Sequence, residues 1–178
     1  MYDVSVIIPA YNEAENIKAT ICDLVKYFEL TGMKAEIIVS DDGSTDSTVS
    51  VAQSVGGVRV LIGERNIGKG SAVRRGLAAA SGASVVITDA DGAYKPCNIG
   101  YALPHLAHCD AVFGMRRFQG SYPVFRRAAS LCYRVLASAL LGIWHVDFQC
   151  GFKVLSHHAA KYGSSPERRG GTGGWPWL

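Results

Sequence analysis

Three short acidic stretches carry the residues best suited to chemistry in this sequence. The sharpest, Asp89-Ala-Asp91, places two carboxylates at positions i and i+2 and is followed by a glycine. A tight turn there can direct both carboxylates toward one cation, and Mg²⁺ and Mn²⁺ prefer hard oxygen ligands from protein, water and phosphate. The pair directly follows an apolar run, Val85-Val-Ile-Thr88. We therefore predict that Asp89 and Asp91 hold Mg²⁺ or Mn²⁺ beside a bound diphosphate.

The second stretch, Ser40-Asp-Asp-Gly-Ser-Thr-Asp46, places Asp41 and Asp42 directly after another apolar run. A carboxylate in that position can accept a hydrogen bond from a base N–H or a ribose hydroxyl, as acidic residues do in nucleotide-binding folds. Asp46 is predicted instead to supply a negative charge at a helix N-terminus. Ser44 or Thr45 is positioned to cap that helix.

The remaining stretch, Pro9-Ala-Tyr-Asn-Glu13, precedes the other two in the chain. Tyr11 offers an aromatic face and Glu13 offers a carboxylate beside it, and together these could stack on and hydrogen-bond a nucleobase. The alternative is purely structural: Asn12 caps the following helix, and Tyr11 is a partly buried tyrosine. In chain order, we call residues 9–13 the first loop, residues 40–46 the second loop and residues 89–94 the third loop.

The segments around these loops alternate between two hydrophobic patterns. Short apolar runs rich in β-branched residues are typical of buried strands, and apolar residues at helical spacing follow them. We expect strands at residues 4–9, 36–40, 58–62 and 83–88, with helices from Asn12 to Gly32, through Val55, and from Gly68 to Ala80. This order predicts an α/β fold with a mostly parallel sheet flanked by helices. Right-handed crossovers would then bring the three loops to one edge of the sheet.

The pattern is looser after residue 95. Further strands are expected at residues 110–114 and 151–155, and a long helix is expected at residues 122–143. From Ser164 onward the chain is rich in glycine and lacks periodicity. We predict one domain over residues 1–160, incomplete at its C-terminal end, and an irregular tail over residues 161–178.

Composition narrows the class of protein. A length of 178 residues suits one α/β domain, and 48% hydrophobic and 19% charged residues are ordinary for a globular protein. No secretory pattern is present, and the longest apolar run, residues 135–143, is far short of the ~20 residues that span a membrane. The five cysteines form no metal-binding pattern. We expect reduced, mostly buried thiols in a cytoplasmic protein.

Charge is divided unevenly along the chain. Residues 1–110 hold 9 Lys and Arg against 13 Asp and Glu, a net −4, whereas residues 111–178 hold 9 against 2, a net +7. An acidic front and a basic back suggest a metal site followed by a surface that meets phosphates or an anionic membrane. For the last dozen residues a solvated basic tail is the simpler explanation. We expect no nucleic-acid partner.

Taken together, the motifs IIPAYNE, SDDGSTD and TDADG resemble the GT-A domain of family 2 glycosyltransferases. Asp147-Phe-Gln-Cys-Gly-Phe-Lys153 and the DADGA form resemble the branch that glucosylates or mannosylates dolichyl or polyprenyl phosphate. The resemblance covers about residues 3–158. It implies a GT-A, Rossmann-like sheet, a metal-dependent hexosyltransferase activity, and UDP-glucose or GDP-mannose as the donor.

The resemblance also implies roles for individual residues. Those expected around the base and ribose are Pro9, Tyr11, Glu13 and Asp41, while Asp89 and Asp91 would hold the nucleotide and the metal. Those expected near phosphate groups of donor or acceptor are Arg116, Arg126, Ser130 and Lys153. Asp147 would face the sugar or the acceptor. Mannosyl members commonly carry Gln where this chain has Ala93, which favours glucose and leaves a metal ligand to water.

The acceptor decides what the mechanism of an inverting transfer requires. A hydroxyl acceptor needs a base, and Asp147 is the candidate. A lipid monophosphate is already anionic and needs charge neutralisation, which Arg116 and Arg126 could supply. The sequence holds several arginines and no convincing isolated base, so we expect a polyprenyl phosphate acceptor and a position at the cytosolic membrane face. Transfer to a sugar hydroxyl, or an inactive nucleotide-binding module, are the alternatives.

Overall fold

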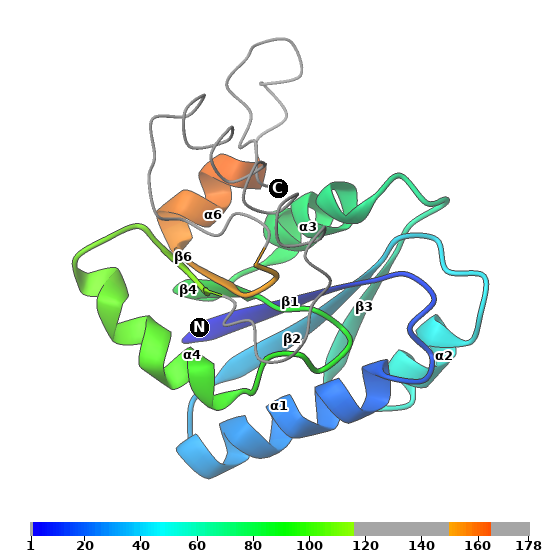
Figure 1. Ribbon diagram of the computed structural model, residues 1–178, viewed down its shortest axis with the longest axis horizontal. Coiled ribbons are helices and arrows are strands. Elements are labelled where there is room, and N and C mark those ends of the chain that lie inside the picture. The colour runs from blue at the N-terminus through cyan, green and yellow to red at the C-terminus, as the bar shows by residue number, and fades with distance from the viewer. Residues whose placement is uncertain (1, 116–149, 165–178) are drawn as a thin grey trace, which may run out of the picture.

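The computed structural model of the chain describes residues 2–115 and 150–164. Strands and helices alternate along most of this part (Figure 1). The strands are β1 (Val4–Ala10), β2 (Ala35–Asp41), β3 (Val58–Ile62), β4 (Ser84–Ile87), β5 (Ala111–Phe113) and β6 (Lys153–Ser156). The helices are α1 (Ile17–Thr31), α2 (Thr48–Gln53), α3 (Lys69–Ala79), α4 (Cys97–Ala102), the 3-10 helix η1 (Leu103–Ala107) and α6 (His157–Ser164).

The six strands form one sheet in the order β3-β2-β1-β4-β6-β5. β1 is central and pairs in parallel with β2 and β4, and β3 extends the parallel set beyond β2. β6 then runs antiparallel to both β4 and β5. The predicted α/β fold with a mostly parallel sheet is confirmed. The antiparallel direction of β6 was not predicted.

Helices cover both faces of the sheet, because successive strand residues point to opposite sides. Val4, Val6 and Ile8 of β1 pack in a cluster with residues of α1, α2 and α4, whereas Ile7 packs with residues of α3 and α6. Figure 1 shows these two sets of helices on opposite sides of the sheet. α1 contributes its apolar stripe at helical spacing, with Ile17, Ile21, Leu24 and Phe28 buried. These two layers fix the positions of the strand ends that carry the loops.

The helices differ from the sequence expectation in several places. α1 begins at Ile17 rather than after Asn12, although it ends as expected at Gly32, which has a φ of 69°. α2 ends at Gln53 rather than Val55, and α4, η1 and α6 were not predicted as helices. α6 continues to Ser164, past the predicted domain boundary at residue 160. The long helix expected at residues 122–143 lies outside the described residues.

Candidate functional site

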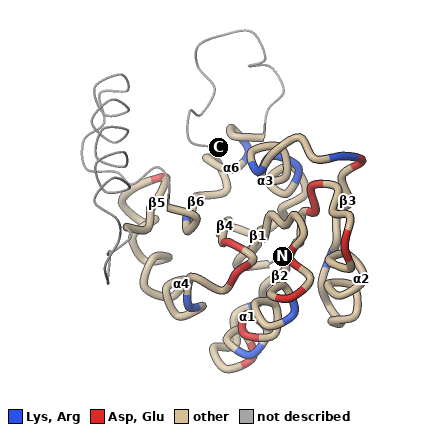
Figure 2. Tube along the Cα trace, turned by 45° about the vertical axis from the view of Figure 1, so that its right-hand side comes forward, with Lys and Arg blue, Asp and Glu red and all other residues tan. Residues whose placement is uncertain are grey.

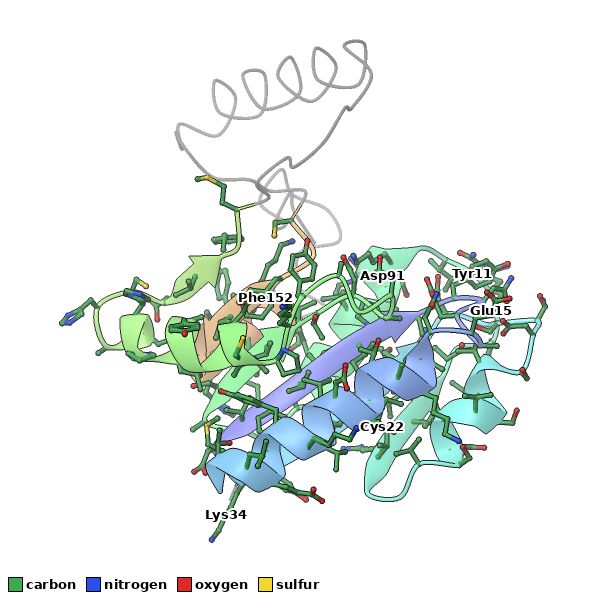
Figure 3. The ribbon with its side chains drawn as sticks, turned by 60° about the horizontal axis from the view of Figure 1, so that its bottom comes forward. Tyr11, Glu15, Cys22, Lys34, Asp91 and Phe152 are labelled. Carbon is green, nitrogen blue, oxygen red and sulfur yellow. The ribbon has the colours of Figure 1, made fainter. Side chains whose placement is uncertain are left out.

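A cleft of about 470 Å³ lies where the parallel strands end at their carboxyl edge. Its walls come from the first loop, the second loop, the third loop and the start of α3. The lining residues are Pro9, Ala10, Tyr11, Glu13, Asp42, Asn66, Gly68, Lys69, Ala72, Asp89, Ala90 and Asp91. Figure 3 shows Tyr11 and Asp91 at this edge, with Lys34 at the opposite end of the sheet. The expected convergence of the three loops is therefore present.

The first loop is tied to the second by the side chain of Asn12. The Oδ1 atom of Asn12 accepts a hydrogen bond from the backbone N–H of Thr45 at 2.9 Å. The backbone N–H of Asn12 donates to Ser44 Oγ at 2.9 Å. Asn12 adopts a left-handed φ of 54°, a conformation in which Asn is enriched. The predicted helix-cap role of Asn12 was wrong, because its amide is used between the two loops. Ser44 likewise binds these loops and does not cap α2.

Asp46 and Thr48 hold the next part of the first loop. Thr48, which is fully buried, accepts from the N–H of Glu13 at 2.8 Å and donates to Asp46 Oδ1 at 2.5 Å. Asp46 Oδ2 accepts from the N–H of Ala14 at 3.2 Å. The hydrogen bond from the Thr48 hydroxyl lowers the pKa of Asp46. Asp46 lies at the start of α2 as predicted, and it also supports the backbone that carries Glu13.

Asp41 and Asp42 face different surroundings although they are adjacent. Asp41 is buried, and its Oδ2 accepts from the N–H groups of Gly43 at 3.0 Å and Ser44 at 2.9 Å. The hydroxyl of Ser44 donates to the other oxygen of Asp41. This carboxylate therefore shapes the turn of the second loop. Asp42, rather than Asp41, lines the cleft.

Asp42 combines a satisfied oxygen with an unsatisfied one. Its Oδ2 accepts from the N–H groups of Ile67 at 3.1 Å and Gly68 at 2.6 Å, which attaches the second loop to the start of α3. Its Oδ1 is buried without a hydrogen-bond partner in the described part of the chain and lies 3.9 Å from a guanidinium nitrogen of Arg75. A buried acceptor in a cleft wall is costly unless something donates to it. A ligand N–H or O–H could satisfy it.

The third loop presents its two carboxylates unequally. Asp91 is exposed, and its Oδ1 accepts from the N–H of Ala93 at 3.0 Å, while Gly92 takes a φ of 71° in the predicted tight turn. The Asp89 side chain is 26% exposed and forms an ion pair with Lys69. Thr20 of α1 anchors the turn by donating to the carbonyl of Ala90 at 2.7 Å. Figure 2 shows acidic segments beside β1, β2 and β4 and basic segments on α3.

The donor set of this turn fits a hard divalent cation. It consists of carboxylate oxygens, and no group of three or more His, Cys, Asp or Glu that could hold a metal occurs in residues 2–115 and 150–164. Mg²⁺ is usually held by one or two carboxylates and completes its shell with water and phosphate oxygens. Asp89 and Asp91 match that arrangement.

Lys69 is the cleft residue whose place the sequence left open. It is the first residue of α3, an 11-residue helix that lies within the helix expected from Gly68 to Ala80. The structure places its ammonium group on Asp89 in the cleft wall. A lysine at a helix N-terminus suits an anionic ligand, because the free N–H groups and the helix dipole favour negative charge there. In the sequence, the Gly68-Lys69 pair at the start of the expected helix was the feature that could have indicated a place for Lys69 in the cleft.

Several other predicted residues lie away from the cleft lining or outside the described residues. Lys153 begins β6, is 8% exposed, and stands in register with Ile87 and Phe113. Arg116, Arg126, Ser130 and Asp147 lie outside the described residues. The cysteines of the described part, Cys22, Cys97, Cys109 and Cys150, are free thiols, but only Cys150 is buried, so the expectation of mostly buried thiols was wrong.

The hydrogen bond from the backbone N–H of Glu13 to the Thr48 hydroxyl ties the first loop to the start of α2, and we call it the tether. It can be tested with Thr48→Val, which keeps the shape of the side chain and removes its hydroxyl. The N–H of Glu13 loses its acceptor, so we expect the free energy of unfolding to fall by about 1–3 kcal/mol. Urea denaturation measures this, and Thr48→Ser should retain most of the stability. Equal stability of wild type and Thr48→Val would contradict the tether.

The hydrogen bond from the Thr48 hydroxyl to Asp46 predicts how the stability of the fold depends on pH. Because the pKa of Asp46 is lowered in the folded state, the contribution of its carboxylate is present at neutral pH and lost as the pH falls through that lowered value. We expect the stability difference between wild type and Thr48→Val to narrow in urea titrations taken from pH 7 to about pH 3. A difference that widens in acid would contradict this assignment.

Comparison with known proteins agrees with the geometry of the cleft. The family model described as glycosyl transferase family 2 matches residues 5–163. A dolichyl-phosphate beta-glucosyltransferase of Mus musculus is 32% identical over 88% of this chain and 56% of that protein. An uncharacterized protein of Methanocaldococcus jannaschii is 30% identical over 84% of this chain and 69% of that protein.

A solved structure shows the same likeness. Glucosyl-3-phosphoglycerate synthase from Mycobacterium tuberculosis, in complex with Mn²⁺, UDP-glucose and phosphoglyceric acid, has a TM-score of 0.68 and 29% identity over 88% of this chain and 57% of that one. The chain thus spans a little over half the length of this enzyme and of the mouse relative. The resemblance found in the motifs is confirmed. This chain belongs to glycosyltransferase family 2 and has its GT-A fold.

Proposed function

We propose that this chain binds UDP-glucose in the cleft and transfers glucose, with inversion, to a polyprenyl or dolichyl phosphate. The observation that carries the proposal is the cleft itself, in which groups suited to a nucleoside and groups suited to a metal-bound diphosphate share one wall. The printed name of the mouse relative and the donor in the M. tuberculosis complex support glucose over mannose. GDP-mannose becomes the less favoured donor.

The nucleoside would lie against the first and second loops. Tyr11, 42% exposed at the cleft, can stack on the base, with Pro9 and Glu13 beside it. The unsatisfied Oδ1 of Asp42 can accept from the base or ribose. Asp41 would contribute indirectly, because its carboxylate holds the turn from which Asp42 projects.

The diphosphate would lie between the third loop and the start of α3. Asp89 and Asp91 would hold Mg²⁺ or Mn²⁺, and the Mn²⁺ of the M. tuberculosis complex supports the use of a divalent ion. When bound, such an ion neutralises the charge that develops on the leaving diphosphate. Lys69 and the N-terminus of α3 would add positive potential on the same side.

The acceptor side is proposed from the sequence and the relatives. A phosphate acceptor needs cationic groups more than a base, so Arg116, Arg126, Ser130 and Lys153 would meet phosphate and Asp147 would face the sugar. The second candidate function is transfer to a hydroxyl group. The M. tuberculosis complex favours it, since its phosphoglyceric acid carries a hydroxyl as well as a phosphate. In that case Asp147 would serve as the base.

The proposed transfer would take place at the cytosolic face of a membrane, because the proposed acceptor is a lipid. The longest described helix, α1, has 15 residues, and the described residues include no candidate for a membrane-spanning helix. The basic C-terminal third would provide the attraction to an anionic surface.

Transfer can be measured directly with labelled UDP-glucose, Mn²⁺ and dolichyl phosphate in detergent. We expect a glucosyl lipid that is absent when EDTA is added. Parallel reactions with phosphoglyceric acid and with free glycans test the second candidate. Transfer to either of these and not to the lipid would contradict the lipid acceptor, and UDP binding without any transfer would indicate an inactive nucleotide-binding module.

Asp91→Ala tests the metal assignment. We expect it to remove the Mn²⁺-dependent part of the affinity for UDP and to lower kcat/KM by about 100-fold or more, because charge on the leaving group is no longer neutralised. Circular dichroism should show an intact fold, since Asp91 is exposed. Asp23→Ala, at an exposed position on α1, is the control. Unchanged Mn²⁺-dependent binding in Asp91→Ala would show that the metal assignment is wrong.

A further inference from the structure

The backbone of Gly151 lies directly against the carboxylate of Asp89, although the two residues are far apart in the sequence. A Cβ atom placed on Gly151 would lie 1.8 Å from Asp89 Oδ2 and 2.3 Å from its Cγ. These distances are far below any real contact. A residue other than glycine at position 151 would therefore force the carboxylate of Asp89 to move.

Tyr94, at the end of the third loop, holds Gly151 in this position. Its hydroxyl oxygen accepts from the N–H of Gly151 at 3.0 Å and from the thiol of Cys150 at 3.4 Å. Its ring also packs against Phe152, with the centroids 5.8 Å apart (Figure 3 labels Phe152). Burial raises the pKa of Tyr94. One side chain therefore contacts three successive residues of segment 150–152.

The opposite side of segment 150–152 is equally close-packed. A Cβ on Gly114 would lie 2.7 Å from Cys150 Sγ, and the N–H of Gly114 donates to the carbonyl of Phe152 at 2.9 Å. Segment 150–152 is thus enclosed between Gly114 and the Asp89 carboxylate. It has little freedom to move away from Asp89.

The Asp89 carboxylate is confined on two sides as a result. Both oxygens lie against Gly151, Oδ2 more closely than Oδ1, and Oδ1 is also bound by the ammonium group of Lys69. Asp91, by contrast, is exposed, and its Oδ1 accepts a hydrogen bond from the backbone N–H of Ala93 within the same turn. The two carboxylates of the third loop therefore differ: Asp89 has a fixed orientation, and Asp91 has an accessible one.

We propose that Gly151 and Tyr94 are positioning residues that fix the orientation of the Asp89 carboxylate for the metal-bound nucleotide. The inference rests on the proposed function, since it concerns the same cleft. It also links segment 150–152, which leads directly into Lys153 and β6, to the third loop. A movement of that segment would be transmitted to Asp89 through the Tyr94 hydroxyl and the contact at Gly151.

The test is calorimetric titration of the full 178-residue chain with UDP in the presence of Mn²⁺. We expect Gly151→Ala to weaken binding by about 10-fold or more, because the added methyl group displaces Asp89. Tyr94→Phe keeps the ring and removes the hydroxyl, and we expect a loss of about 3- to 10-fold. A methyl group on Gly56, between α2 and β3, would meet nothing within 4 Å, so Gly56→Ala is the control, and its affinity should stay within about 2-fold of wild type.

A double-mutant cycle separates positioning of Asp89 from a general structural role. In an Asp89→Asn background, Gly151→Ala should cause little further loss of affinity, because the carboxylate through which it acts is already absent. Equal losses in both backgrounds, or wild-type affinity in Gly151→Ala and Tyr94→Phe, would overturn the inference. If Gly151→Ala does not fold by circular dichroism, the same cycle with Tyr94→Phe decides.

The wild-type titration separates failure of the positioning role from failure of the proposed function. Mn²⁺-dependent UDP binding by wild type, with both variants unaffected, would overturn the positioning role and leave the proposed function standing. No Mn²⁺-dependent binding by wild type would overturn the proposed function, and the positioning role with it.

Discussion

The parallel pairing of β1 with both β2 and β4 is the constraint on which the cleft depends. Ala10 of β1 stands opposite Asp41 of β2, and Ile7 stands opposite Ile87 of β4, so the three strands end at one edge of the sheet. Parallel strands require helical crossovers, and these place every strand-to-helix loop on that edge. Acidic residues separated by nearly eighty positions in sequence are thereby brought to one cleft.

Within that frame, side chains fix the backbone of the loops before any ligand arrives. Asn12, Thr48 and Asp46 satisfy backbone groups between the first and second loops, and Asp42 reaches the start of α3. Loops held in this way lose little conformational entropy on binding. The buried Oδ1 of Asp42 is left without a hydrogen-bond partner in the described residues.

Most of the parallel sheet could be predicted because local composition decides it: β-branched runs form strands, and regular apolar spacing forms helices. The use of individual polar side chains could not. Asn12 and Ser44 have the chemistry of helix caps, and only the tertiary fold brings them together as a bridge between loops. Neighbouring Asp41 and Asp42 are distinguished by which one faces the cleft. The direction of β6 depends on pairing with β4, a contact that no local pattern encodes.

The most direct measurement of the central claim is paramagnetic broadening by Mn²⁺ in ¹H–¹⁵N spectra of the UDP-bound chain. We predict that amide signals of the first loop, the third loop and the start of α3 broaden together, while those near Lys34, at the opposite end of the sheet, stay sharp (Figure 3). Broadening centred near Lys34, or confined to the third loop with the first loop and α3 unaffected, would contradict the assignment of one shared metal and nucleotide site.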